Sequence, residues 1–294
     1  MISKKRINIF VVTIVILGAV CCLTALIDSP GAKFAFTSIT GEVIDVYGEG
    51  LYKNNSVSGA SQAIAQDIVT LILGIPLLII SLVLFNKRSL KGLFMLTGML
   101  GYFLYTYASY SFLLFYNYFF IIYVTIMSIS FFAFIMCFNK IMKTDLCACF
   151  KNKFNNKTIG CYMLFIAIAL FLMWMGRIIP PLINNSTTDG LEHYTTLIIQ
   201  AMDLGFIVPV CALAGVLTIR KNIFGYILSS IITFKGVALT TALSAMIIGQ
   251  IINGINVSLI EIIIFGLFNA LTVYILIVIL KHIKGQFEYS SCCH

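Results

Sequence analysis

A single lysine, Lys235, lies in the middle of the otherwise uncharged run 223–248. A helix of that length, rising 1.5 Å per residue, spans about 39 Å, so the lysine lies near the midplane of a bilayer. A lone cation at that depth costs about 2.5–3.5 kcal/mol. We therefore expect another polar group to face Lys235, and its partner is the main question that the sequence raises.

The composition sets the class of protein. Of 294 residues, 60% are hydrophobic and only 10% are charged, which leaves too little polar surface to cover a soluble globule. The sequence predicts an all-α, polytopic integral membrane protein forming a single transmembrane domain. Eight stretches are long and apolar enough to be transmembrane helices: 7–27, 68–85, 93–115, 118–138, 158–176, 197–219, 223–248 and 257–280.

The basic residues predict the orientation, because short cytoplasmic loops retain Lys and Arg. With eight crossings, most of them fall on one side, and the outer loops hold only Lys33 and Lys53, with Arg177 at the end of the fifth span. We expect both termini in the cytoplasm, an extracytoplasmic loop at 28–66, a basic cytoplasmic loop at 139–157, and an uncleaved first span. This topology explains the net charge of +8 without nucleic-acid binding, and it suits a bacterial cytoplasmic membrane.

The outer segment 28–66 has local structure of its own. Alternating apolar residues at 34–36 and 42–47, separated by Thr40-Gly41, predict a short β-hairpin. The stretch 60–67 contains good helix formers and is expected to extend the second span above the membrane. The segment is either a packed cap or a lid over a binding pocket.

Two parts of the chain resemble each other in the type and order of their residues. The first set is Gln66-Asp67, Pro76, Lys87-Arg88 and Gly92, and the second is Gln200, Asp203, Pro209, Arg220-Lys221 and Gly225. Four spans in each half would give a 4+4 parallel repeat. Both prolines are expected to bend their helices, either for packing or to expose backbone groups to ions, as in transporters.

The chemistry must come from polar residues at membrane depth. The candidates for a substrate or ion pocket are Lys235, Asp203, Glu261, Asp67, Arg177 and Gln200. By depth Asp203 is nearer to Lys235 than Glu261, which favours a pair between Lys235 and Asp203. The outward course of the lysine's helix argues against the pair, because its Cα–Cβ bond then tilts toward the cytoplasm. Such a pair either holds helices together or lines a polar cavity open to the outside.

Seven tyrosines gather in spans three and four, mostly toward the outer end: Tyr102, Tyr105, Tyr107, Tyr110, Tyr116, Tyr118 and Tyr123. Amphipathic rings favour the headgroup region, so the pattern predicts an aromatic belt. The alternative is a ligand cage, since Tyr102 and Tyr105 are one helical turn apart.

The nine cysteines avoid the outer loops, so structural disulfides are not expected. Four cysteines and the last histidine share the inner face: Cys147, Cys149, Cys292, Cys293 and His294. They could bind zinc, but their spacing matches no standard zinc motif, and we expect no metal. No nucleotide-binding, protease or oxidoreductase motif is present. The weak cluster of His193, Asp189 and Glu192 does not indicate an enzyme, and no cofactor and no catalytic residue are predicted.

Several runs resemble a family of uncharacterised bacterial multi-span membrane proteins found in clostridia and their relatives. The runs are Gly48–Tyr52, Ser58–Asp67 and Gly74-Ile75-Pro76, with further similarity over 98–110 and 203–235. The resemblance covers most of the membrane region and implies common descent. The family has no established activity, so no residue's role can be carried over.

These observations predict a protein that handles a small solute or ion, as a transporter or sensor, through a polar pocket in the outer half of the bundle. The alternative is a membrane scaffold or partner subunit whose charges serve only assembly. The predicted partners are the lipid bilayer and a small solute or ion.

Overall fold

The computed structural model describes residues 4–27, 32–144, 149–150, 154–188 and 190–285. It is 76% helical. Seven helical stretches in this part of the chain are long and apolar enough to cross a membrane: Lys4–Ile27, Val57–Asn86, Phe120–Met142, Asn156–Asn184, Ile198–Ile219, Ile223–Ile252 and Leu259–His282. The expected all-α, multi-span architecture is therefore confirmed at this level.

Most of these stretches are single helices: α1 (Lys4–Ile27), α5 (Phe120–Met142), α7 (Asn156–Asn184), α10 (Ile223–Ile252) and α11 (Leu259–His282). Another helix, α4 (Leu90–Phe112), covers most of the expected third span but carries more tyrosine, serine and threonine. Most of its residues are buried, because it packs against three other helices in the middle of the bundle.

The other two stretches are helices with a π-helical turn inside them. The first consists of α2 (Val57–Val69), η1 (Thr70–Gly74) and α3 (Ile75–Asn86), and the second of α8 (Ile198–Met202), η2 (Asp203–Ile207) and α9 (Val208–Ile219). Pro76 and Pro209 follow the π-turns. Proline lacks an amide hydrogen and crowds the preceding turn, and a wider turn next to it relieves that crowding. The predicted interruption of these two spans is thus a π-turn in each.

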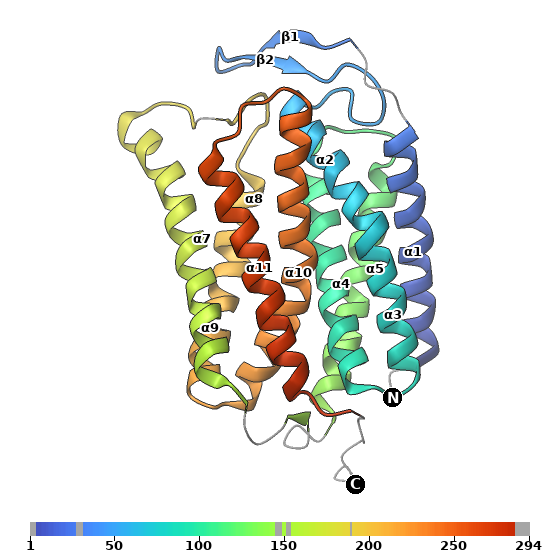
Figure 1. The fold of residues 1–294 in the computed structure, drawn as a ribbon. Helices are drawn as coiled ribbons and strands as arrows, with labels where there is room; N and C mark the ends of the chain where they lie inside the picture. Colours follow the sequence, from blue (N-terminus) through green and yellow to red (C-terminus); the bar gives the residue numbers. More distant parts are fainter. Residues whose placement is uncertain (1–3, 28–31, 145–148, 151–153, 189, 286–294) are drawn as a thin grey trace.

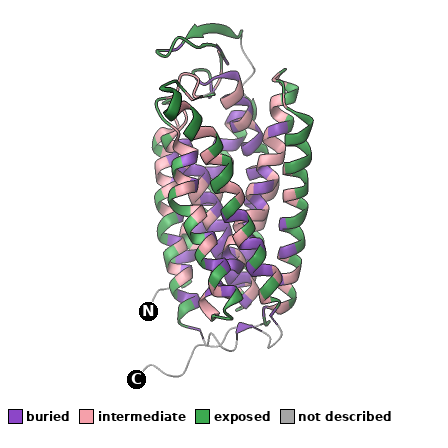
Figure 2. Cartoon of the chain, turned by 90° about the vertical axis from the view of Figure 1, so that its left-hand side faces the viewer, coloured by how far each residue is buried: buried purple, intermediate pink, exposed green. Residues whose placement is uncertain are grey.

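The helices form one bundle whose axes run in roughly the same direction (Figure 1). Helix α4 packs against α3, α5 and α10, and α10 packs against α2, α4, α9 and α11. Helix α1 begins and α11 ends at the same end of the bundle (Figure 1). Apolar side chains such as Ile16, Leu172 and Leu267 are exposed on the outward faces, and Figure 2 shows buried residues gathered between the helices. A surface of this kind suits contact with lipid.

The expected hairpin is present above the opposite end of the bundle (Figure 1). Strands β1 (Phe34–Thr37) and β2 (Val43–Val46) pair antiparallel, with Phe34 opposite Val46. The chain then turns back toward the helices at Gly48, whose φ of +95° favours glycine. Leu51 and Tyr52 are 3% and 2% exposed, so the segment after the hairpin is packed into the bundle.

Candidate functional site

Lys235 lies on α10 where this helix crosses α4. The crossing is close because α4 presents Gly98: a Cβ atom there would lie 2.4 Å from the Phe234 Cβ and 3.1 Å from the Lys235 backbone nitrogen. The lysine side chain is half-buried, and its Nζ lies 4.1 Å from the centroid of the Tyr105 ring. This distance is typical of a cation–π contact.

Asp203 is 7% exposed and stands at the start of the π-turn η2. The Tyr105 hydroxyl donates a hydrogen bond of 2.7 Å to Oδ1, and the Trp174 Nε1–H donates one of 3.0 Å to Oδ2. Tyr105 belongs to α4 and Trp174 to α7, so this carboxylate joins three helical elements. Both of its oxygens have a donor.

The expected direct pair between Lys235 and Asp203 is not formed. In the described ranges, no carboxylate oxygen lies within 4.0 Å of Lys235 Nζ. Tyr105 contacts both groups instead, presenting its ring face to the ammonium and its hydroxyl to the carboxylate. Since α10 begins at the end of the bundle where α1 begins (Figure 1), the Cα–Cβ bond of Lys235 tilts toward that end and away from the acid. A desolvated cation–π contact contributes about 2 kcal/mol, which offsets only part of the cost of a charge at this depth.

The other predicted site residues fall in different places. Gln200 is buried one turn before Asp203, and Arg177 lies one turn after Trp174 on α7. Glu261 is exposed and forms a capping box with Ser258, each side chain accepting a hydrogen bond from the other residue's backbone N–H. Glu261 thus lies in the first turn of α11. The capping-box hydrogen bonds join it to Ser258 and not to Asp203 or Lys235.

Asp67 forms a second polar cluster. Asp67 is 1% exposed, so its side chain lies inside the protein. Its carboxyl group contacts the hydroxyls of Tyr52 at 2.5 Å and Tyr110 at 3.0 Å, and the thiol of Cys22 at 3.6 Å. Tyr52 comes from the outer segment, so residues distant in sequence enclose this acid.

The tyrosines line the interior more than they form a belt. Four of them are buried in the core: Tyr102, Tyr107, Tyr110 and Tyr123. Tyr102 accepts a 2.7 Å hydrogen bond from the Gln66 amide, and its hydroxyl is 2.8 Å from that of Thr70. Only Tyr116 and Tyr118 among the seven are largely exposed. The predicted aromatic belt is therefore wrong for the buried tyrosines.

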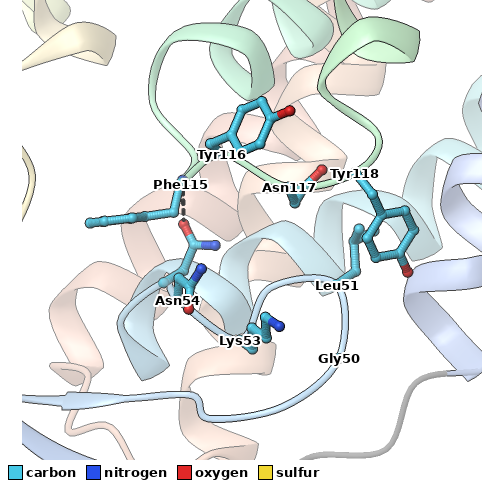
Figure 3. Close-up of a pocket in the computed structure, with 9 residues that line it drawn as sticks. Gly50, Leu51, Lys53, Asn54, Phe115, Tyr116, Asn117 and Tyr118 are labelled. Atoms are coloured by element: carbon cyan, nitrogen blue, oxygen red, sulfur yellow. Dashed lines mark hydrogen bonds between the residues drawn. The ribbon is translucent and has the colours of Figure 1, made fainter.

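The outer end of the bundle contains a cavity of about 290 Å³ between the outer segment and the α4–α5 loop. Figure 3 shows side chains of Lys53, Asn54, Tyr116 and Tyr118 around it, with the Phe115 amide bonded to Asn55. A second cavity of about 180 Å³ also touches Phe115 and extends to Thr195 and Thr196. The outer segment thus lines the first cavity, and the second lies between the end of α4 and the loop after α7.

Glu192 connects the loop after α7 to the start of α2. The Ser56 hydroxyl, which also caps α2, donates a hydrogen bond to the Glu192 carboxylate. Burial raises the pKa of Glu192, and the bond from Ser56 lowers it in part. Neighbouring His193 contacts the Asn54 carbonyl through Nε2 at 3.0 Å. The contacts hold two outer loops together and place no nucleophile next to the histidine.

The residues that the structure describes contain no cluster of three metal-binding side chains. Most of the residues considered for zinc, namely Cys147, Cys292, Cys293 and His294, lie outside the described residues. Cys149 is buried, with its sulfur 3.3 Å from the Thr144 hydroxyl.

No family model, no curated protein and no solved structure matches this chain. The membrane assignment therefore rests on the chain's own helices. Sequence reasoning missed Tyr105, Trp174 and Tyr52 as partners of the acids. Trp174 is the only tryptophan in the chain, and its place on a span next to Arg177 was the one available signal.

Proposed function

We propose that this protein crosses a bacterial cytoplasmic membrane eight times and binds a small solute with an anionic group at Lys235, as a transporter or sensor. The observation that carries the proposal is the ammonium of Lys235, which contacts the face of Tyr105 and, among the described residues, has no carboxylate within 4.0 Å. A half-buried cation with this surrounding attracts an anion. Each oxygen of Asp203 already accepts a hydrogen bond, so this residue shapes the site and sets its polarity.

The place of α4 supports eight crossings. Helix α3 ends and α4 begins at one end of the bundle, and α5 begins at the other (Figure 1). With 23 residues, α4 is long enough to cross the hydrocarbon core. Its polar side chains are tolerated because they face the bundle interior, where they find partners.

Two parallel halves of four spans explain a series of matching positions. Pro76 and Pro209, Lys87 and Arg220, and Gly92 and Gly225 each stand 133 residues apart. At the same interval, Arg88 and Lys221 both have a φ of 60°. Added Cβ atoms on Gly92 and Gly225 would lie 2.5 and 2.7 Å from the Cβ atoms of Leu84 and Leu217, which are again matching positions. Such agreement in backbone geometry supports an internal duplication.

The α4–α10 crossing is then the axis between the halves. Gly98 and Ile231 have the same interval, and a Cβ on Gly98 would lie 2.9 Å from the Ile231 carbonyl oxygen. Two matching positions in contact are expected on a twofold axis along the membrane normal. Interrupted helices around such an axis, here η1 and η2, are used by transporters to build a site and to rock one half against the other.

The second candidate is a scaffold whose polar groups serve assembly. It is favoured by Asp203, which joins η2, α4 and α7 through two hydrogen bonds. A packed scaffold would exclude water from Lys235. A solute site would admit it.

Thiol labelling in intact cells separates the two candidates. We expect a small impermeant methanethiosulfonate reagent to modify Lys235→Cys from outside. The parent chain gives the background from native thiols, and Ile39→Cys, at a fully exposed position beyond β1, gives the signal of an outer loop. Lys140→Cys, near the inner end of α5, is the matched lysine control and should remain unmodified. Labelling of Ile39→Cys with Lys235→Cys protected would support the scaffold.

A further inference from the structure

We infer that Asp67 is a proton-binding site, whose buried carboxyl group holds a proton as a neutral acid and releases it toward the outer face. The site lies in the first half of the bundle and shares no hydrogen bond with Asp203 or Lys235. Proton binding at Asp67 requires no solute at Lys235. This inference can therefore be tested independently of the proposed function.

In the described part of the chain, the titratable groups that interact with Asp67 are tyrosines and cysteines. The titratable side chains that face it come from α1 (Cys21 and Cys22), the outer segment (Tyr52), α4 (Tyr102, Tyr107 and Tyr110) and α5 (Tyr123). Each of these is uncharged when protonated. Helix α10 also packs on α2, and it contributes Gly249 and Gln250 to that contact. In the part of the chain that is described, no cationic side chain lies within 4.0 Å of this carboxyl group.

Both hydrogen bonds of Tyr110 can be satisfied when Asp67 is the neutral acid. The Tyr110 hydroxyl lies 3.0 Å from the Ala63 carbonyl oxygen and 3.0 Å from Asp67 Oδ1. It has one proton, and the carbonyl can only accept. When Tyr110 donates to Ala63, the contact with Oδ1 requires a proton on Asp67. The neutral acid thus satisfies both contacts, and a carboxylate satisfies only one of them.

The second half of the chain carries a neutral group at the matching position. Gln200 stands 133 residues after Asp67, and it is buried as well. An amide and a carboxylic acid have nearly the same shape, and both donate and accept hydrogen bonds. The buried amide of Gln200 in one half is therefore consistent with a protonated Asp67 in the other.

The side of Asp67 toward the outer end is covered by Tyr52. Its hydroxyl is 2.5 Å from Asp67 Oδ2, and its chain neighbours Leu51 and Lys53 line the cavity at the outer end (Figure 3). On release, the O–H bond of Asp67 breaks, the proton goes to water, and the electron pair remains on the carboxylate. In the described part of the chain, the buried hydroxyls of Tyr107 and Tyr123 have no hydrogen-bond partner, and Tyr110 packs against both rings.

Infrared spectroscopy of the purified protein tests the assignment. A protonated carboxyl group has a carbonyl band that a carboxylate lacks. We expect this band at pH 7, about three units above the ordinary pKa of aspartic acid. It should be lost in Asp67→Asn and retained in Asp203→Asn, which is the matched control. Equal bands in the parent and in Asp67→Asn at every pH where both are folded would overturn the proposal.

Two further measurements keep the test decisive. If Asp67→Asn does not fold, labelling all aspartates with ¹³C should shift the band of the parent, and Tyr110→Phe should move it again by removing a hydrogen-bond partner. A ¹³C-insensitive band would overturn the assignment to aspartate. A band that appears only when sodium is removed would also overturn it, since Asp67 would then be a cation ligand.

Discussion

The two buried acids occupy related positions but have different surroundings. At the 133-residue interval, Asp67 and Thr70 correspond to Gln200 and Asp203, so the acid has moved by one helical turn between the halves. Tyr102, which contacts Thr70, corresponds to Lys235 near Asp203. Tyr52 encloses Asp67 from outside, whereas Asp203 has α4 and α7 beside it and a half-buried cation nearby. Under the proposed duplication, related positions thus form one closed, neutral site and one charged site.

The largest effect is expected where the two halves meet. Gly98→Ala adds a Cβ atom 2.4 Å from the Phe234 Cβ and 2.9 Å from a backbone oxygen, so α4 and α10 must separate. Overpacking of this kind costs about 3 kcal/mol. Thermal unfolding in detergent should show a large fall in Tm.

The control for this variant is Gly176→Ala on α7, where a Cβ meets nothing within 4 Å. That change should leave Tm unchanged or raise it, since alanine favours helices by about 0.5–1 kcal/mol over glycine. Equal Tm values for the two variants would show that α4 and α10 do not pack tightly at Gly98.

The next effect separates the two acid sites. Tyr52→Phe removes a donor from an acid that is fully buried, and we expect a loss of about 2 kcal/mol. Tyr105→Phe leaves Asp203 with its bond from Trp174, so the loss should be about 1 kcal/mol. The exposed Tyr116→Phe is the control and should be neutral. Chemical denaturation measures these losses. If Tyr105→Phe lowered the free energy of unfolding more than Tyr52→Phe, the assignment of Asp67 as the more closed site would be wrong.

The smallest effect concerns pH at the outer end. Because burial raises the pKa of Glu192, its ionisation costs more in the folded state than in the unfolded one. The stabilising contribution is complete below the unfolded pKa of about 4.3 and is lost as pH rises through the folded pKa. After screening by solvent it amounts to less than about 1 kcal/mol.

Comparing Tm against pH for Glu192→Gln and the parent checks this contribution. The variant should lack the decline that the parent shows above pH 4.3, and Glu49→Gln, at an exposed position after the hairpin, should keep it. An identical pH profile in Glu192→Gln and the parent would refute the role of Glu192.

Local patterns in the sequence predicted what depends on local structure. The hairpin followed from alternating residues around Gly41, and the interrupted spans followed from Pro76 and Pro209. The role of Glu261 was also readable, since Ser258 and Glu261 have the spacing of a capping box. Glu261 therefore caps α11 in the structure and is not part of the group around Lys235.

The partners of the acids could not be predicted, because they depend on how distant elements pack. The burial of Asp67 requires Tyr52 to return from the hairpin to α2, and no periodicity encodes that path. Likewise, Tyr105 meets the Lys235 ammonium where Gly98 lets α4 approach α10 closely, and the choice between Tyr102 and Tyr105 depends on the rotation of α4. Depth along a helix placed Lys235 and Asp203 in the same region but did not reveal the ring between them.

A double-mutant cycle on Lys235→Met and Asp203→Leu tests most directly whether Asp203 neutralises the lysine. With Tyr105 between the two groups, we expect Asp203→Leu to be destabilising through its lost bonds, Lys235→Met to be tolerated, and the coupling free energy to be below about 1 kcal/mol. A coupling of about 3–5 kcal/mol, with each single variant strongly destabilised and the double variant recovering, would indicate a direct buried ion pair and contradict the account.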